Sequence, residues 1–344
     1  MKKDACFNSI LVDCIRIFAA WCVLLGHCFG FYQITIFKDE TYFFAIQNMA
    51  VIVFFSLAGF LMVYSIEKMK NDISWGKYIF HQGKRIYSIY IPALISVIVI
   101  DGISILLYPN KYGYYSSYDV RTFLGNLCML QNIPFENVIA RFGSNKPLWT
   151  MANEWWLYVI MSFFYINFYK RKRMDVKSLV LAGLLVIFFV KYIYSGLAVS
   201  FVLGMMIFLL YERKKNIRRL YYILAVGIML AGGGIIGVRY KQAYILPFFV
   251  FIPVLLWCIL ELGRKNINGN NNEILRLYAR STFPLYLLHY PIIELLIKVN
   301  ISKQYSFLCV IVLSNLVAII FAYVFDEKYS IKRIQKGICK NDNV

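Results

Sequence analysis

Long apolar stretches alternate with short polar segments along almost the whole chain. A helix needs about 20 apolar residues to cross a bilayer, and ten stretches of roughly suitable length can be drawn. They predict an all-α polytopic membrane protein with a single domain over residues 1–344, in which helices fill 10–325 and 326–344 is a short tail. The ten predicted spans cover 10–32, 44–66, 87–107, 148–168, 178–194, 197–211, 220–238, 244–262, 281–298 and 305–325.

Basic residues are distributed unevenly between the two sides of these spans. With the N-terminus inside, 26 of the 37 Lys and Arg residues fall in segments predicted to be cytoplasmic, and ten fall in outer segments. Cytoplasmic loops carry such an excess of positive charge, so both termini are predicted to be cytoplasmic. Asp13 and Arg16 interrupt the first apolar stretch, which we interpret as an uncleaved signal anchor rather than a signal peptide.

Composition agrees with a membrane protein and argues against two other classes. The chain is 60% hydrophobic and only 16% charged, whereas soluble domains carry about 25% charged residues. The net charge of +19 is spread in short clusters between the spans, which does not favour nucleic acid as a partner. The eight Cys are scattered without a CxxC pair, so no metal site is expected.

The first span carries three ionisable residues in an otherwise apolar run, Asp13, Arg16 and His27. Each costs a few kcal/mol to insert, so such residues usually have a function. Arg16 and His27 lie within roughly 20° on one helix face and roughly 16 Å apart along the axis. Asp13 is a neighbour of Arg16 on the same side. A packed imidazole bonded to a backbone carbonyl is the alternative for His27.

Glu154 is the second candidate, because its expected depth matches that of His27. It lies roughly 9 Å below the outer end of its span, and His27 lies roughly 8 Å below the same surface. A carboxylate beside an imidazole orients the ring and raises its basicity. The pair would suit general-base catalysis on a hydroxyl. The alternative is an ion pair between Glu154 and a basic residue near the membrane surface.

Two further stretches allow a functional and a structural interpretation. Residues 78–90 contain Lys84 and Arg85, which form either a cationic site for phosphate groups or an ordinary positive cytoplasmic flank. His289 lies near the middle of its span with Tyr286 one turn earlier. It either contributes to a site or forms a structural hydrogen bond between helices.

Five stretches in this order resemble motifs of the acyltransferase-3 family, integral membrane O-acyltransferases of bacterial surface glycans. The first is Leu-Val-Asp-Cys-Ile-Arg, which ends at Arg16 and is followed by ten residues and then His27. Each motif is loose alone, but five in order are specific. The other four are Phe-Phe-Ser-Leu-Ala-Gly-Phe at 54–60, Arg-Ile-Tyr-Ser-Ile-Tyr at 85–90, Pro-Leu-Trp through Glu154 to Tyr158, and Ser281 to Pro291.

The resemblance implies transfer of an acyl group, usually acetyl, from acyl-CoA to a hydroxyl of a cell-surface or lipid-linked glycan. It implies a multi-pass protein of the bacterial cytoplasmic membrane whose partners are acyl-CoA, the glycan acceptor and membrane lipid, without a metal. We assign His27 and Glu154 to catalysis, Asp13, Arg16, Arg85, Tyr286 and His289 to acetyl-CoA, and Trp149, Asn153 and Tyr158 to the acceptor.

Two other functions fit the helices and basic loops. One is a transporter or flippase for lipid-linked glycans, and the other is a non-catalytic membrane partner of the same fold. A transporter does not explain why His27 shares a helix face with Asp13 and Arg16 while Glu154 is expected at matching depth, and a non-catalytic partner would be recognised by unchanged glycan acylation in His27→Ala and Arg16→Ala. We therefore expect an enzyme with direct acyl transfer, because no Ser or Cys is clearly placed as a nucleophile.

Overall fold

A computed structural model of the whole chain is entirely helical over the residues it describes, without strands. These residues are 7–33, 41–69, 74–131, 139–172, 175–190, 195–212, 246–263 and 273–325. The α-helices are α1 (Ser9–Tyr32), α2 (Thr41–Lys68), α3 (Trp75–Leu107), α4 (Val120–Leu127), α5 (Leu148–Phe164), α6 (Val176–Phe189), α7 (Ser195–Glu212), α9 (Leu246–Leu262), α10 (Glu273–Leu296) and α11 (Lys303–Phe325). Three short turns of other helix types are η1 (Pro109–Lys111), η2 (Tyr115–Ser117) and the π-helix η3 (Tyr165–Lys170).

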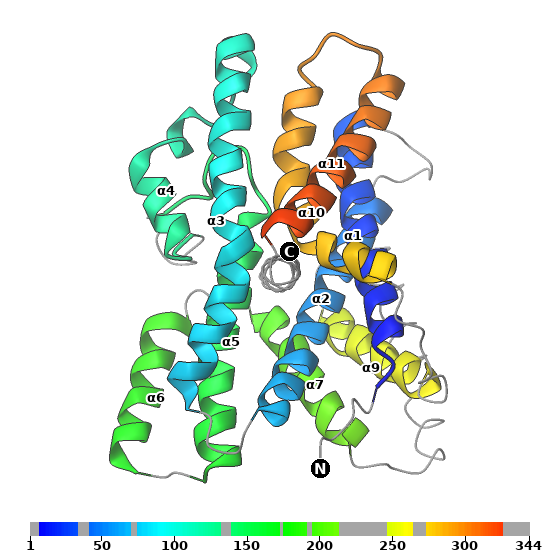
Figure 1. Cartoon of the computed structure of the whole chain (residues 1–344). Helices are drawn as coiled ribbons and strands as arrows, with labels where there is room; N and C mark the ends of the chain where they lie inside the picture. The colour runs from blue at the N-terminus through cyan, green and yellow to red at the C-terminus, as the bar shows by residue number, and fades with distance from the viewer. Residues whose placement is uncertain are drawn as a thin grey trace, which may run out of the picture.

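The helices form a bundle with two distinct ends (Figure 1). Helix α1 ascends to the upper end, α2 descends and α3 ascends again, while α10 and α11 meet in a hairpin at the upper end. Helix α10 packs on α11, α1 and α3, and α2 packs on α7, α1 and α9. The upper end therefore combines the end of α1, the start of α2 and the second half of α10.

Most of the predicted spans have a helical counterpart in the structure. Four helices are long and apolar enough to cross a membrane, by length and composition only: Ser9–Tyr32, Ile46–Lys68, Trp75–Leu107 and Lys303–Phe325. Shorter apolar helices cover Val176–Ile187, Gly196–Tyr211 and Phe248–Leu262. The prediction at 220–238 falls outside the described residues, so the count of ten spans and the orientation of the termini stay predictions.

Helix α3 differs from its prediction because it begins at Trp75 rather than near residue 87. The Ser74 side chain caps its first turn by accepting a hydrogen bond from the Lys77 backbone N–H. Hydropathy detects where a helix is apolar, but it does not detect where the helix starts. Arg85 consequently lies on the lower part of a 33-residue helix and not in a loop.

Close contact between α2 and α7 depends on two glycines. A Cβ at Gly59 would lie 2.0 Å from the Phe201 carbonyl oxygen, and a Cβ at Gly204 would lie 2.0 Å from the Ser56 carbonyl oxygen. Both distances are far below van der Waals contact, so each helix uses a glycine where the other backbone approaches. Small residues bring membrane helices together in this way.

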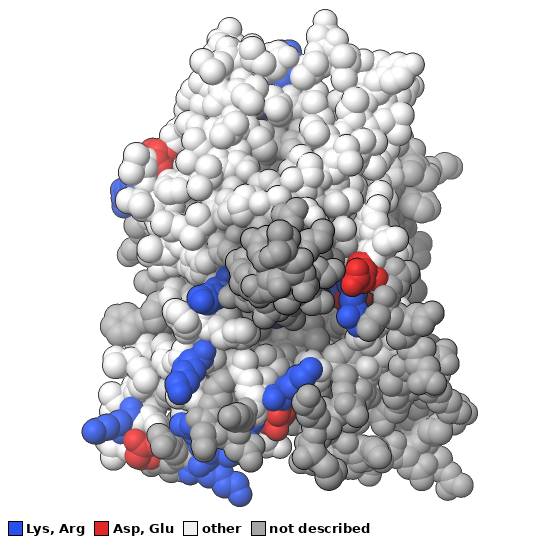
Figure 2. All heavy atoms as spheres, viewed as in Figure 1, with Lys and Arg blue, Asp and Glu red and all other residues white. Residues whose placement is uncertain are grey.

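Charge is distributed unevenly over the face of the bundle drawn in Figure 2. Blue Lys and Arg side chains gather over the lower half, whereas the upper half is largely uncharged. Cytoplasmic segments of membrane proteins carry an excess of positive charge, so the lower end is the one that we expect to face the cytoplasm.

Candidate functional site

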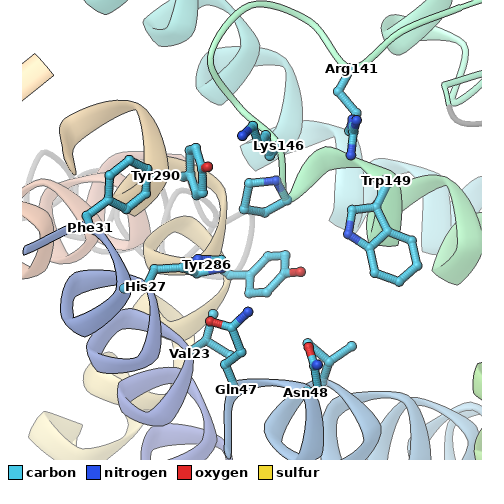
Figure 3. A pocket seen from close by; sticks show the side chains of 13 residues that line it. Val23, His27, Phe31, Gln47, Asn48, Arg141, Lys146, Trp149, Tyr286 and Tyr290 are labelled. Carbon is cyan, nitrogen blue, oxygen red and sulfur yellow. The ribbon is translucent and has the colours of Figure 1, made fainter. Parts of the chain in front are cut away.

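A cavity of about 510 Å³ lies among the upper ends of the helices. Figure 3 shows Lys146 and Arg141 on one side of it, Gln47 and Asn48 on the opposite side, and His27 beside Tyr286 between them. Its wall is therefore a mixture of cations, amides, an imidazole and aromatic rings. The lining residues are Val23, His27, Gly30, Phe31, Gln47, Asn48, Val51, Arg141, Lys146, Pro147, Trp149, Tyr286 and Tyr290.

His27 is half-buried and lines the cavity from α1. Its ring centroid is 5.2 Å from that of His289 and 5.1 Å from that of Tyr290, which it meets edge to face. Packing against two rings fixes the orientation of an imidazole. His27 is therefore a titratable group held in place at the wall of a cavity large enough for a small substrate.

His289 lies beside His27 but is 1% exposed and does not line the cavity. Its Nδ1 is 3.0 Å from the Leu285 carbonyl oxygen. A carbonyl oxygen only accepts, so this contact assigns the proton to Nδ1 in the neutral ring. The Nε2 atom is left with a lone pair and has no hydrogen-bond partner in the described part of the chain. The structure thus pairs two imidazoles, of which only His27 lines the cavity.

Helix α10 is tied to the start of α5 on the same side of the cavity. The hydroxyls of Tyr286 and Thr150 are 2.7 Å apart. The side-chain amide of Asn145 donates to the Leu287 carbonyl oxygen at 2.7 Å. Pro291 has no N–H for that carbonyl four residues earlier, so Asn145 supplies the missing donor.

A second cluster lies lower in the bundle, around Glu154. Its carboxylate accepts a hydrogen bond from Tyr158 and interacts electrostatically with Arg85 and Arg16. The Tyr158 oxygen in turn accepts a hydrogen bond from the Arg85 guanidinium. Glu154 of α5 and Arg16 of α1 are both partly accessible to solvent. The cluster is therefore a network of compensated charges rather than an apolar contact.

Asp13 extends this cluster towards α10. It interacts electrostatically with Arg16, then with Arg276 and Arg280. The last two are one turn apart on α10, and sequence analysis counted them only among the cytoplasmic basic residues. A signal for them was present, because an i, i+4 pair of arginines lies on one helix face. Four arginines thus converge near two carboxylates, which is an arrangement that attracts anionic groups.

The structure changes the predicted pairing of His27 with Glu154. The charged or titratable groups that act on His27 are His289 and Lys146, whereas Arg85 and Arg16 act on Glu154. Their equal depth does not bring them together because depth fixes only one coordinate. In the described structure the rings beside His27 are those of His289 and Tyr290. The catalytic roles assigned to His27 and Glu154 remain predictions.

The remaining predicted residues divide between the two regions. Trp149 and Tyr286 line the cavity, and Tyr286 also interacts electrostatically with Glu154. Asn153 is 2% exposed and its side-chain amide donates to the Trp149 carbonyl oxygen. Tyr158, predicted to contact the acceptor, belongs instead to the lower cluster.

Asp101 of α3 is a further ionisable residue that sequence analysis missed. It is 1% exposed and accepts hydrogen bonds from the Ser144 N–H at 2.8 Å, the Ser144 hydroxyl at 2.6 Å and the Tyr112 hydroxyl at 2.9 Å. Its place in an apolar run was the available signal. Asp101 thereby fixes the loop that carries Arg141 and Lys146.

Tyr112 and Tyr114 attach the preceding segment in the same way. Tyr112 donates to Asp101, and Tyr114 donates to Glu294 of α10. Burial, together with the neighbouring carboxylate, raises the pKa of each phenol. Both hydroxyls therefore stay protonated and act as donors at any ordinary pH.

Gly143 is required by this arrangement, which gives a stability prediction. Its φ of +56° is in the left-handed region, and a Cβ would lie 2.1 Å from the Asp101 Oδ2. We expect Gly143→Ala to lower the unfolding free energy by about 2–3 kcal/mol through backbone strain and displacement of Asp101. Thermal unfolding of the purified variant in detergent would measure this as a lower Tm. Gly113→Ala is the matched control, because no atom lies within 4 Å of its added Cβ, and an equal Tm change in both variants would contradict the prediction.

Comparisons with known proteins add one finding. The model of the acyltransferase-3 family, described as an acyltransferase domain, matches residues 10–327. The match runs from the first turn of α1 to beyond the end of α11 and so includes both the cavity and the arginine cluster. No curated protein and no solved structure matches the chain.

Proposed function

Because the chain belongs to the acyltransferase-3 family, we propose that it moves an acetyl group from acetyl-CoA to a hydroxyl of a cell-surface or lipid-linked glycan. That it is a membrane acyltransferase follows from the family and the apolar helices. The observation that carries the proposal is a half-buried imidazole, His27, at the wall of a cavity and on the same helix as Arg16, which belongs to the lower arginine cluster.

The acceptor hydroxyl enters the upper cavity in this proposal. Trp149, Tyr286 and Tyr290 offer aromatic surfaces to a sugar ring. The amides of Gln47 and Asn48 face them across the cavity (Figure 3) and can both donate to and accept from hydroxyls. An apolar wall with a few polar groups is typical of sites for small molecules. This lining supports a saccharide better than a lipid tail.

The donor is held at the lower cluster. The phosphates of acetyl-CoA bind Arg16 and Arg85, and we add Arg276 and Arg280 to this site because they interact with Asp13 beside Arg16. Arginine binds phosphate oxygens with two parallel hydrogen bonds. Asp13 and Glu154 hold the guanidinium groups in place. The axial distance of roughly 16 Å from Arg16 to His27 suits the pantetheine arm.

Transfer then needs one base and no covalent enzyme intermediate. His27 removes the proton from the acceptor hydroxyl, and the oxygen attacks the carbonyl carbon of the thioester. The C–O bond forms as the C–S bond breaks, and the CoA thiolate leaves with the proton that His27 accepted. The atoms balance as one ester and one thiol. His289 beside His27 keeps its ring oriented and needs no contact with substrate.

Label transfer tests this function directly. Membranes from cells with and without the gene would be incubated with acetyl-CoA labelled in the acetyl group. We expect label in envelope glycan and equivalent release of free thiol only when the gene is present. Mass spectrometry and NMR of the glycan should show a missing ester in cells without it. If membranes that contain the protein transfer no label to glycan, and only cells with the gene export glycan normally, the result would contradict acyl transfer and favour a flippase.

A further inference from the structure

The charge of the cavity lining is one-sided. Arg141 and Lys146 both line it, while its thirteen lining residues include no Asp or Glu. Both cations are exposed at its wall, and Figure 3 shows them on the same side. Two positive charges beside a cavity attract an anionic group. The lining therefore distinguishes this cavity from one shaped only for neutral sugars.

Neither cation forms a salt bridge with another described residue, unlike Lys170 with Glu67 and Lys298 with Glu294. The ammonium of Lys146 lies 5.8 Å from the Tyr114 ring centroid and 5.9 Å from that of Tyr290. Cation–π contacts position a charge without neutralising it. Lys146 thus keeps its capacity to bind an anion.

Nearby carboxylates are engaged elsewhere. Asp101 accepts three hydrogen bonds from Ser144 and Tyr112. Glu294 accepts from Tyr114 and lies 3.7 Å from the Lys298 ammonium. Both carboxylates are buried. These two carboxylates are therefore bound by other partners, while Arg141 and Lys146 line the cavity.

The loop that carries these cations is held at fixed points. Ser144 and Asn145 are both fully buried, and they bond Asp101 and the Leu287 carbonyl oxygen. Lys146 comes next and is followed by Pro147, the residue at the N-cap of α5. The proline ring restricts the backbone φ angle at this point. A preorganised cation loses less entropy on binding than a mobile surface lysine does. This loop is built as a binding element rather than as a solvated turn.

We propose that the acceptor carries a negatively charged group, a carboxylate or a phosphate, which binds Arg141 and Lys146 while the hydroxyl to be acylated lies at His27. The proposal rests on the proposed function and narrows its acceptor to anionic saccharides. A sugar carboxylate and the phosphate of a lipid-linked saccharide share this chemistry. The buried Gln47 Oε1 has no hydrogen-bond donor among the described residues, and a neutral hydroxyl of the same saccharide supplies one.

Binding without the acyl donor tests the proposal independently of catalysis. Purified protein in lipid nanodiscs would be titrated by calorimetry with three probes: tri-galacturonate, maltotriose and a short polyprenyl-diphosphate disaccharide. We expect one charged probe to bind at least about tenfold more tightly than maltotriose. Tri-galacturonate as the tight binder identifies a sugar carboxylate, and the diphosphate identifies a lipid-linked acceptor. Equal affinity for all three probes would overturn the proposal.

Charge-removing variants assign the effect to the two cations. Arg141→Gln and Lys146→Gln should each lower the affinity for the charged probe about tenfold and leave the affinity for maltotriose unchanged. Arg121→Gln is the matched control, because Arg121 is exposed on α4 and does not line the cavity. The inference is wrong if Arg121→Gln lowers the affinity for the charged probe equally, or if the two cavity variants leave that affinity unchanged.

Label transfer measured on the same preparation separates this inference from the proposed function. Acetyl transfer to envelope glycan without any preference among the probes would contradict only the anionic acceptor. A clear charge preference without acetyl transfer would contradict the acyltransferase mechanism and leave the anion site in place.

Discussion

Replacing His27 with Ala is expected to lower the rate of acetyl transfer by about 10³-fold while the affinity for acetyl-CoA is kept. General-base catalysis contributes about 10²–10⁴-fold, and His27 is the titratable base that lines the cavity. His27→Gln should lower the transfer rate equally, because an amide keeps a hydrogen bond but does not accept the proton. Initial rates with saturating labelled acetyl-CoA would measure kcat, and equilibrium binding of the donor would show that the fold is retained.

The other two histidines provide controls for this result. His81 is exposed on the lower part of α3, so His81→Ala should leave the rate unchanged. His289→Gln should reduce it by about tenfold, because its role is to orient the neighbouring ring and not to contact substrate. A His27→Ala enzyme that retains a tenth of the activity would show that another group is the base. A His289 variant that loses as much as His27→Ala would make the two imidazoles one catalytic unit.

The long helices were predictable because apolar length and composition nearly decide them. Helices α1, α2 and α11 have bounds close to the predicted spans. This follows because a helix that faces lipid must stay apolar over the whole thickness of the bilayer. The start of α3 was not predictable in this way. Its first turns, from Trp75 to Arg85, are polar enough to read as a loop, and only the Ser74 cap and packing against α5 make them helical.

The site was predictable along the helix axis but not around it. Helical rise gives an expected separation of Arg16 from His27 along the axis, because both residues lie on α1. Whether His27 and Glu154 meet depends on how α1 and α5 are oriented towards each other, and the sequence does not supply that orientation. The contact between α1 and α10 brings His289 to His27, and no periodicity in either helix indicates that pairing.

The loop residues of the cavity carried the weakest signal. Arg141 and Lys146 lie in an irregular segment, where no repeat predicts which way a side chain points. Their position is set by Asp101, which is distant in sequence and reaches Ser144 through α3. An isolated carboxylate within an apolar run was the clue to this anchor, although its partner could be found only from the fold.

Arg16→Gln is expected to raise the Kd for acetyl-CoA by about 100-fold. A hydrogen bond to a charged group contributes about 1.5–3 kcal/mol, and each 1.4 kcal/mol corresponds to about tenfold. The variant also removes one of the positive charges that act on Asp13 and Glu154, so the remaining site attracts phosphates less strongly. Lys77→Gln, which removes an exposed cation near the start of α3, should change the Kd little. Equilibrium binding of labelled acetyl-CoA measures both.

A donor without phosphates sharpens this test. S-acetyl-pantetheine keeps the thioester and the arm but has no anionic group for the arginines. If Arg16 binds phosphate, Arg16→Gln should impair transfer from acetyl-CoA and leave transfer from S-acetyl-pantetheine nearly unchanged. An equal loss with both donors would show that Arg16 supports the helix packing or the thioester instead.

The same pair of donors decides what Glu154 does. Because its charged neighbours are Arg85 and Arg16, Glu154→Gln should follow the Arg16 pattern and affect acetyl-CoA more than S-acetyl-pantetheine. A carboxylate that assisted His27 would lower kcat with both donors alike. The double variant adds a second criterion, since residues in one ion network are not additive. Arg16→Gln combined with Glu154→Gln should therefore cost less than the sum of the two single changes, whereas His27→Ala with Glu154→Gln should be close to additive.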